Sequence, residues 1–256
     1  MALLEVVGLN KNFGGLAAVH EVDFNVECGE LLGIIGPNGA GKTTLFNLLT
    51  GIYRPTSGRI VFDGKDITGS KPYQTARYGI GRTFQRTTIF KQATAIDNLI
   101  VGRSLHVKTG TFGSILRTAK YCREEKQTRD KAREILAFVG LSEKEDRLAG
   151  NLTEEAQKRL SIALVLATDP RLVLLDEPTG GVNLEEIGGL IELVGKIRKR
   201  GITICLIEHK MRMVMSISDR IIVLNYGKKI AEGTPEEDAK SEEVIKAYLG
   251  ARRDAA

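Results

Sequence analysis

The feature that most constrains this chain is a glycine-rich loop between two apolar segments. It reads GPNGAGKT over residues 36–43, which fits the pattern GxxxxGK[ST]. The apolar run Leu31–Gly36 before it is typical of a strand buried on both faces, and an apolar helix is expected over Thr43–Leu49. Glycines let consecutive backbone amides curl around a polyphosphate, and a helix N-terminus adds partial positive charge. This segment therefore predicts a phosphate site.

Individual side chains of the loop have distinct expected roles. Lys42 supplies an ammonium for the β- and γ-phosphates, and the Thr43 hydroxyl is placed for Mg²⁺. The other residues expected to contact the nucleotide are Asn38, Gly39, Gly41 and Thr44. The alternative is a glycine-rich turn that merely precedes a helix, and the strand, lysine and threonine in register argue against it.

Two acids end a second apolar strand about 130 residues later. In Val173–Glu177, we expect Asp176 to hold Mg²⁺ directly or through water, and Glu177 to polarise the attacking water as general base. The alternative is that both acids cap a strand at the surface. His209 follows a third apolar strand, 202–209, where a histidine could contact the γ-phosphate or be purely structural.

Composition excludes several classes of protein. Hydrophobic residues make up 42% and charged residues 27% of 256 residues, which rules out disorder, collagen and a disulfide scaffold. No apolar run approaches the roughly 18 residues of a membrane span, and the N-terminus, with Glu5, predicts no signal peptide. The three cysteines form no CxxC pair, which indicates reduced thiols.

Strand and helix patterns alternate along the chain and predict an α/β fold with a mainly parallel core sheet. The first 30 residues and the Asp63–Gly64 hairpin of 59–69 indicate an antiparallel β subdomain. We expect one domain over 1–256, with its core in 1–85 and 167–250, a helical subdomain inserted at about 86–166 and a tail at 251–256. A short helix is expected at 72–78, a further helix at about 184–199 and a last helix at 242–249.

The segment 103–133 concentrates positive charge. It holds nine Lys and Arg against three Asp and Glu, a balance of +6, which exceeds the +5 of the whole chain. The charge is consistent with a solvated helical face, with contact to a partner, or with anionic lipid head groups.

In this order, the motifs resemble the ATP-binding cassette of ABC transporters, a class of P-loop NTPase. The resemblance extends over roughly residues 3–250 and assigns further roles. Gln85 in RTFQ resembles the glutamine that contacts Mg²⁺ or water, His209 resembles the switch histidine, and Phe13 in KNFGG resembles the aromatic residue that stacks on adenine. Gly180–Asn183 resembles the D-loop.

A closer resemblance is to the ATP-binding subunits of branched-chain amino-acid importers. The stretches that carry it are NFGGLAAV, IGPNGAGKTTLFNLLTG, ARYGIGRTFQ, TGTFGSILRT, ISDRI and IKAYLG. This resemblance implies ATP hydrolysis with ATP and Mg²⁺, a homo- or heterodimer with a second cassette, separate membrane permeases, indirect work with a solute-binding protein, and no nucleic acid. It implies a cytoplasmic location, peripheral on the inner face of the membrane.

One motif of this chain departs from the family pattern. The signature motif of the family resembles LSGGQ. Here Leu152 is followed by Thr153, Glu154, Glu155 and Ala156, so that Glu155 replaces the second glycine and Ala156 replaces the glutamine. In the family this loop faces the γ-phosphate bound by the opposite subunit. Thr153 is a good N-cap and acids suit a first helical turn, but two like charges about 4 Å apart repel by about 4 kcal/mol at an effective dielectric near 20.

Three alternatives remain open at this point. The altered loop could impair hydrolysis, or its acids could face solvent and leave the loop functional. The chain could also be a soluble, non-transport ABC ATPase that acts on nucleic acid or the ribosome. The transported substrate follows only from the resemblance, because a cassette does not touch the solute.

Overall fold

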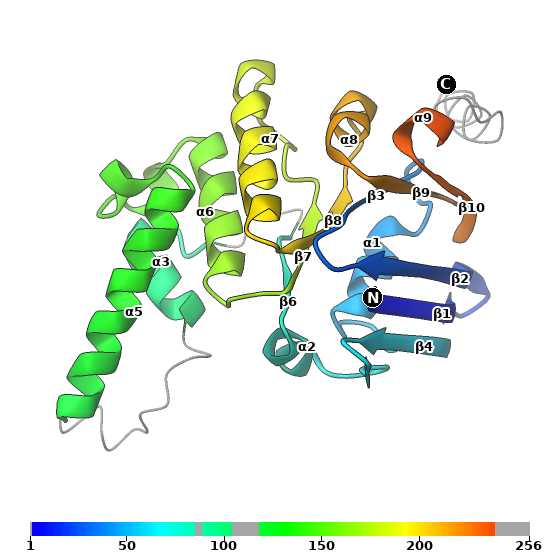
Figure 1. Cartoon of the computed structure of the whole chain (residues 1–256), viewed down its shortest axis with the longest axis horizontal. Coiled ribbons are helices and arrows are strands. Elements are labelled where there is room, and N and C mark those ends of the chain that lie inside the picture. Colours follow the sequence, from blue (N-terminus) through cyan, green and yellow to red (C-terminus); the bar gives the residue numbers. More distant parts are fainter. Residues whose placement is uncertain (1, 85–88, 104–117, 239–256) are drawn as a thin grey trace. The chain divides into compact units, whose positions relative to one another are not determined.

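The computed structural model describes residues 2–84, 89–103 and 118–238. The polypeptide divides into two compact units (Figure 1). Unit 1 comprises Met1–Arg82, Arg171–Pro178 and Ile191–Ala256, and unit 2 comprises Thr83–Pro170 and Thr179–Leu190.

Unit 1 contains an antiparallel sheet in the order β2-β1-β4-β5. Its strands are β1 (Ala2–Phe13), β2 (Leu16–Glu27), β4 (Ser57–Phe62) and β5 (Lys65–Asp66). Asp63 and Gly64 both have positive φ, as a tight two-residue hairpin turn requires, so the predicted hairpin between β4 and β5 is confirmed.

A six-stranded sheet forms the rest of the β structure of unit 1, in the order β10-β9-β3-β8-β7-β6. The strands are β3 (Leu31–Ile35), β6 (Ile80–Arg82), β7 (Leu172–Asp176), β8 (Thr203–Ile207), β9 (Arg220–Asn225) and β10 (Lys228–Gly233). All neighbours pair in parallel except β10, which is antiparallel to β9. The prediction of a mainly parallel core sheet is confirmed.

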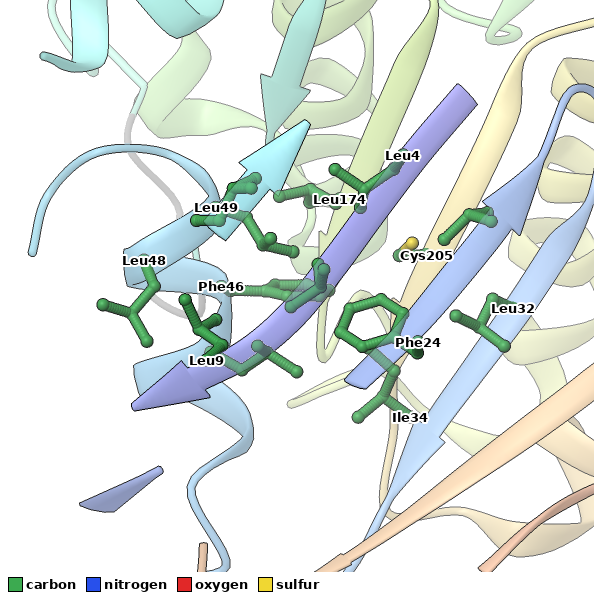
Figure 2. Close-up of a cluster of buried hydrophobic side chains, with 14 of the residues drawn as sticks. Leu4, Leu9, Phe24, Leu32, Ile34, Phe46, Leu48, Leu49, Leu174 and Cys205 are labelled. Carbon is green, nitrogen blue, oxygen red and sulfur yellow. The ribbon is translucent and has the colours of Figure 1, made fainter. Parts of the chain in front are cut away.

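Helix α1 (Lys42–Leu49) supplies the core that joins these two sheets. Its Leu45, Phe46 and Leu49 are fully buried in one cluster with residues of β1, β2, β3, β7 and β8 (Figure 2). On the parallel sheet, Val214 of α8 (Met211–Ile217) packs in a second cluster with Ile35. The chain therefore leaves β3 and enters α1 with both elements buried, which holds the intervening loop in place.

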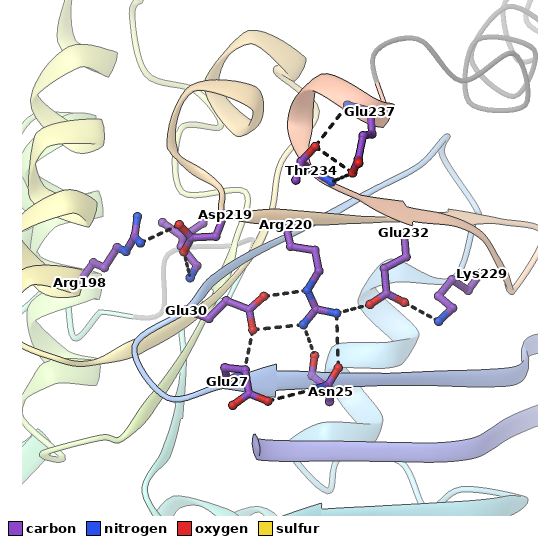
Figure 3. A network of polar contacts seen from close by, with 11 residues as sticks. Asn25, Glu27, Glu30, Arg198, Asp219, Arg220, Lys229, Glu232, Thr234 and Glu237 are labelled. Carbon is purple, nitrogen blue, oxygen red and sulfur yellow. Dashed lines mark hydrogen bonds and ion pairs between the residues drawn. The ribbon is translucent and has the colours of Figure 1, made fainter. Parts of the chain in front are cut away.

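An Arg-centred network joins the two sheets at another point. Arg220 of β9 pairs with Glu30 and with Glu232 of β10, and its guanidinium also donates to the backbone of Asn25 in β2 (Figure 3). Asp219 accepts from the backbone N–H of Leu31, the first residue of β3. The ISDRI stretch thus has a structural role in this chain, because it positions the strand that leads into the glycine-rich loop.

The described residues of unit 2 are mainly helical. This unit contains α3 (Ala95–Gly102), α5 (Ala119–Phe138) and α6 (Glu154–Leu166), with short 3₁₀ turns at Ser142–Lys144 and Ala149–Asn151. Helices α2 (Pro72–Tyr78) and α7 (Leu184–Lys199) match their predicted bounds, and α9 spans Pro235–Asp238. The helix expected at 242–249 lies outside the described residues. Within those residues, no helix combines the length and apolarity that crossing a membrane requires.

Candidate nucleotide-binding and catalytic site

The glycine-rich loop is held by backbone contacts on two sides. The N–H of Gly227 donates to Ala40 O at 3.1 Å, and the N–H of His20 donates to Gly227 O at 2.8 Å. Gly41 has φ +99, and a Cβ there would approach Ala18 O to 2.4 Å, so only glycine fits. The loop is therefore anchored to β2 and to the β9–β10 turn. Its predicted ligand residues are open to different degrees: Asn38, Gly39 and Thr43 are exposed, while Gly41 and Thr44 are half-buried.

Lys42 is buried and folds back onto the loop that precedes it. Its Nζ donates to Gly36 O at 2.7 Å and to Pro37 O at 2.9 Å. Burial lowers the pKa of this lysine, while the charges of Glu177 and Asp176 oppose that effect. The ammonium therefore lies within the electrostatic reach of both acids that the sequence singled out.

Asp176 ends β7 in a buried ion pair that the sequence did not predict. Its Oδ2 lies 2.7 Å from Nη2 of Arg82, and the two side chains are only 1% and 4% exposed. Burial raises the pKa of Asp176, and the hydrogen bond from Arg82 opposes this rise. Removing one partner of such a pair typically costs about 3–5 kcal/mol.

Glu177 and His209 lie together, as a base and an orienting histidine would. Glu177 Oε1 is 2.8 Å from Nε2 of His209, and the N–H of Glu177 donates to Ile207 O at the end of β8. Glu177 has φ +47, a conformation that is strained for a residue with a side chain. The two side chains are 20% and 42% exposed, so both are open to solvent and to a bound ligand.

Phe13 lies at the end of β1 with 43% of its surface exposed. Tyr53 packs against it edge-to-face, with ring centroids 5.2 Å apart, and Lys11 Nζ lies 4.9 Å from the Phe13 centroid. A partly open aromatic ring with a supported edge can stack on a flat base. The sequence did not point to Tyr53.

The altered signature loop begins α6 of unit 2. Thr153 is its N-cap, because its Oγ1 accepts the N–H of Ala156 at 3.3 Å, and Ala156 is fully buried. Glu154 is exposed, whereas Glu155 forms an ion pair with Arg159 one turn later. Glu155 is therefore not the uncompensated charge that the expected repulsion assumed, since Arg159 offsets it.

Gln85 lies outside the described residues, and with it the predicted contact to Mg²⁺ or water. The D-loop stretch 180–183 falls in unit 2, where the carboxylate of Glu154 lies close to Gly181.

Four contacts were not predicted from the sequence: those of Arg82, Asn47 and Tyr53 in unit 1 and that of Arg159 in unit 2. Arg82 had a detectable signal, because it is a charged residue at the end of an apolar strand that must be buried. The other three carry no signal of their own, since their roles depend on which neighbours the fold supplies.

The donor set fits a hard cation held jointly with phosphates. Thr43 and Asp176 offer a hydroxyl and a carboxylate, the oxygen ligands that Mg²⁺ prefers. In the described part of the chain, no three His, Cys, Asp or Glu side chains are arranged to hold a metal alone. Mg²⁺ commonly binds through one or two protein groups plus substrate phosphates, so this sparse set suits it.

The fold and the site together define a class of protein, a nucleotide-binding cassette of the phosphate-loop type. A family model described as ABC transporter matches residues 19–180, and the chain belongs to this family. Its members that bind ATP are ATPases, and this chain is an ATPase of that kind. A second model, described as branched-chain amino acid ATP-binding cassette transporter, matches residues 228–254.

The individual relatives are branched-chain amino-acid transport proteins. The chain is 45% identical over 249 residues to the high-affinity branched-chain amino acid transport ATP-binding protein BraF of Pseudomonas aeruginosa. The match covers 97% of this chain and 98% of BraF. It has the same identity and coverage with LivG of Escherichia coli. A probable LivG of Methanocaldococcus jannaschii is 35% identical over 98% of both chains.

Solved structures show the same fold. The crystal structure of an ATP-binding cassette of an ABC transporter in its ADP conformation matches with a TM-score of 0.85 and 33% identity, over 98% of this chain and 99% of that one. The CbiO1 cassette from Clostridium perfringens matches with a TM-score of 0.80 and 29% identity, over 98% and 95%. The predicted ATP-binding cassette fold is confirmed.

Proposed function

We propose that this chain hydrolyses ATP with Mg²⁺ to drive import of amino acids, in particular branched-chain amino acids, through separate permease subunits. The observation that carries the proposal is the hydrogen bond between Glu177, which follows the buried strand β7, and His209. Lys42 lies within electrostatic reach of Glu177. The names of the relatives support the substrate class.

We assign the roles in hydrolysis as follows. The amides of the loop and Lys42 hold the phosphates, and Thr43 and Asp176 are the residues that would hold Mg²⁺. Bound there, the ion would neutralise charge on the phosphoryl oxygens. Glu177 takes the proton of the attacking water, and His209 orients the Glu177 carboxylate through their hydrogen bond. Gln85 and Phe13 keep the roles that the family resemblance implies.

The assembly that fits this function contains a second cassette and membrane permeases. We propose that the chain is peripheral on the cytoplasmic face of the membrane and that 86–166 acts as an inserted subdomain. We further propose that the basic segment 103–133 contacts a partner or lipid head groups. Family membership favours this reading over an ABC ATPase that acts on nucleic acid.

Co-purification tests the assembly directly. We expect a tagged full-length chain, co-expressed with the permeases encoded near its gene, to bring these membrane proteins down and to hydrolyse ATP faster in their presence. Mass spectrometry of the purified complex and a phosphate-release assay measure the two effects. Recovery of ribosomes or RNA with no permease would contradict the proposal.

A cassette with impaired hydrolysis at its partner's site is the alternative that the acids at the start of α6 raised, and family membership does not favour it. Glu155 stands where the family pattern has glycine, so this position carries a side chain where the pattern has none. We expect the double change Glu155→Gly with Ala156→Gln to strengthen ATP-dependent association with a second cassette. Size-exclusion chromatography with ATP on the Glu177→Gln background measures association without turnover.

A matched control separates this effect from general loss of an ion pair. Glu134 pairs with Lys131 on α5 of the same unit, so Glu134→Gly removes an exposed helical pair away from the signature loop. Association that is unchanged in the double variant would show that Glu155 and Ala156 leave the loop functional.

A further inference from the structure

We infer that Arg82 is a positioning residue that holds the Asp176 carboxylate in register with helix α1. The inference rests on the proposed function, since it concerns the site where Thr43 and Asp176 would hold Mg²⁺. It assigns a role to Arg82, which begins the RTFQ stretch but received no role of its own from the sequence.

The strand pairing explains why Arg82 reaches Asp176. Arg82 ends β6 opposite Leu174 in the parallel neighbour β7. Leu174 and Asp176 project from the same face of β7, because side chains alternate along a strand. A long arginine side chain spans the remaining offset, and its Nη2 lies 2.7 Å from Asp176 Oδ2.

The other end of the guanidinium holds α1. Arg82 Nη1 donates to Asn47 Oδ1 at 2.6 Å and lies 3.4 Å from Thr50 Oγ1, while the guanidinium carbon lies 5.5 Å from the Phe46 ring centroid. One planar group therefore links β6, β7 and α1 in unit 1. A lysine could not do this, since it presents a point charge rather than a rigid fork of donors.

The link leads back to the phosphate loop. Asn47 lies four residues after Thr43, so both project from one face of α1, about 6 Å apart along its axis. Fixing Asn47 against Asp176 therefore fixes the start of α1, with the Thr43 hydroxyl, against the same carboxylate. The two proposed Mg²⁺ ligands, Thr43 and Asp176, come from α1 and β7. Arg82 hydrogen bonds to both of these elements.

The test compares metal affinity with stability in purified full-length protein. We expect Arg82→Lys to weaken Mn²⁺ binding to the ATP-bound protein by about 10- to 100-fold, the usual effect of losing a partner of a metal ligand. Electron paramagnetic resonance of Mn²⁺ measures this affinity. ATP binding in EDTA, followed by fluorescence of a labelled nucleotide, is expected to stay at the wild-type value.

Two further variants keep the inference testable if Arg82→Lys does not fold. Asn47→Ala removes only the α1 half of the link and is expected to weaken Mn²⁺ binding as well, whereas Asn47→Asp retains an acceptor and restores it. The matched control is Arg59→Lys, which alters the exposed pair with Asp66 on the β4–β5 hairpin and is expected to leave Mn²⁺ affinity unchanged.

The outcomes distinguish a failure of the proposed function from a failure of the inference about Arg82. Wild-type protein that binds no Mg²⁺–ATP would overturn the proposed function itself. Wild-type protein that binds it, with Arg82→Lys and Asn47→Ala retaining full Mn²⁺ affinity at a lowered melting temperature, would show that Arg82 is structural only.

Discussion

Replacing Glu177 with glutamine is expected to leave ATP binding intact and to lower turnover by about 10²- to 10⁴-fold, the usual contribution of a positioned general base. The amide keeps the size of the side chain and can still hydrogen bond to His209, whose Nε2 lies 2.8 Å from Glu177 Oε1 in the wild-type site. It cannot accept a proton from water. Phosphate release and labelled-nucleotide binding, measured on the same preparation, separate the chemical step from affinity.

The control for this variant is Glu237→Gln. Glu237 accepts hydrogen bonds from the backbone N–H and the hydroxyl of Thr234 at the start of α9. Replacing Glu237 with glutamine therefore removes one carboxylate without touching the nucleotide site. Turnover of Glu177→Gln at the wild-type level would exclude Glu177 as the base, and an equal loss in Glu237→Gln would point to a general defect of the fold.

Replacing Lys42 with alanine is expected to abolish detectable nucleotide binding. Losing charge-assisted bonds of about 1.5–3 kcal/mol each corresponds to about 10- to 150-fold in affinity per bond, and an ammonium between two phosphates makes more than one. Isothermal titration with Mg²⁺–ATP measures the loss. The wild-type ammonium already bonds to Gly36 O and Pro37 O, so nucleotide phosphates must compete with these carbonyls for it.

Because those two bonds also stabilise the loop, the melting temperature of Lys42→Ala must be recorded beside its affinity. Lys196→Ala is the matched control, since it removes an exposed lysine that pairs with Glu192 on α7. Unchanged ATP affinity in Lys42→Ala would refute the assigned role, whatever its stability.

Local patterns predicted the elements well, because their causes are local. Helices 72–78 and 184–199 and the Asp63–Gly64 hairpin follow from apolar spacing, a proline at a helix start and residues that tolerate positive φ. Strands β3, β7 and β8 are buried along their whole length, as continuous apolar runs imply.

The effect of the charges in the signature loop could not be predicted from local patterns. From the sequence, Glu155 added negative charge beside a partner's phosphate. In the structure Arg159 is its ion-pair partner and also donates to Val139 O at 3.0 Å, a contact that depends on how α5 and α6 pack. A charge can be counted from the sequence, but its neutralisation depends on its neighbours.

The sequence by itself predicted the class of the protein, which the comparisons confirm, and the residues proposed to bind phosphate, because a glycine loop followed by lysine and threonine has a pattern that phosphate chemistry explains. The tertiary structure alone decided the partners of those residues. Glu177 meets His209, and Asp176 meets Arg82 and through it Asn47, because parallel strands distant in sequence end at one edge of the sheet beside α1. Such contacts depend on the order and register of strands, which local patterns do not encode.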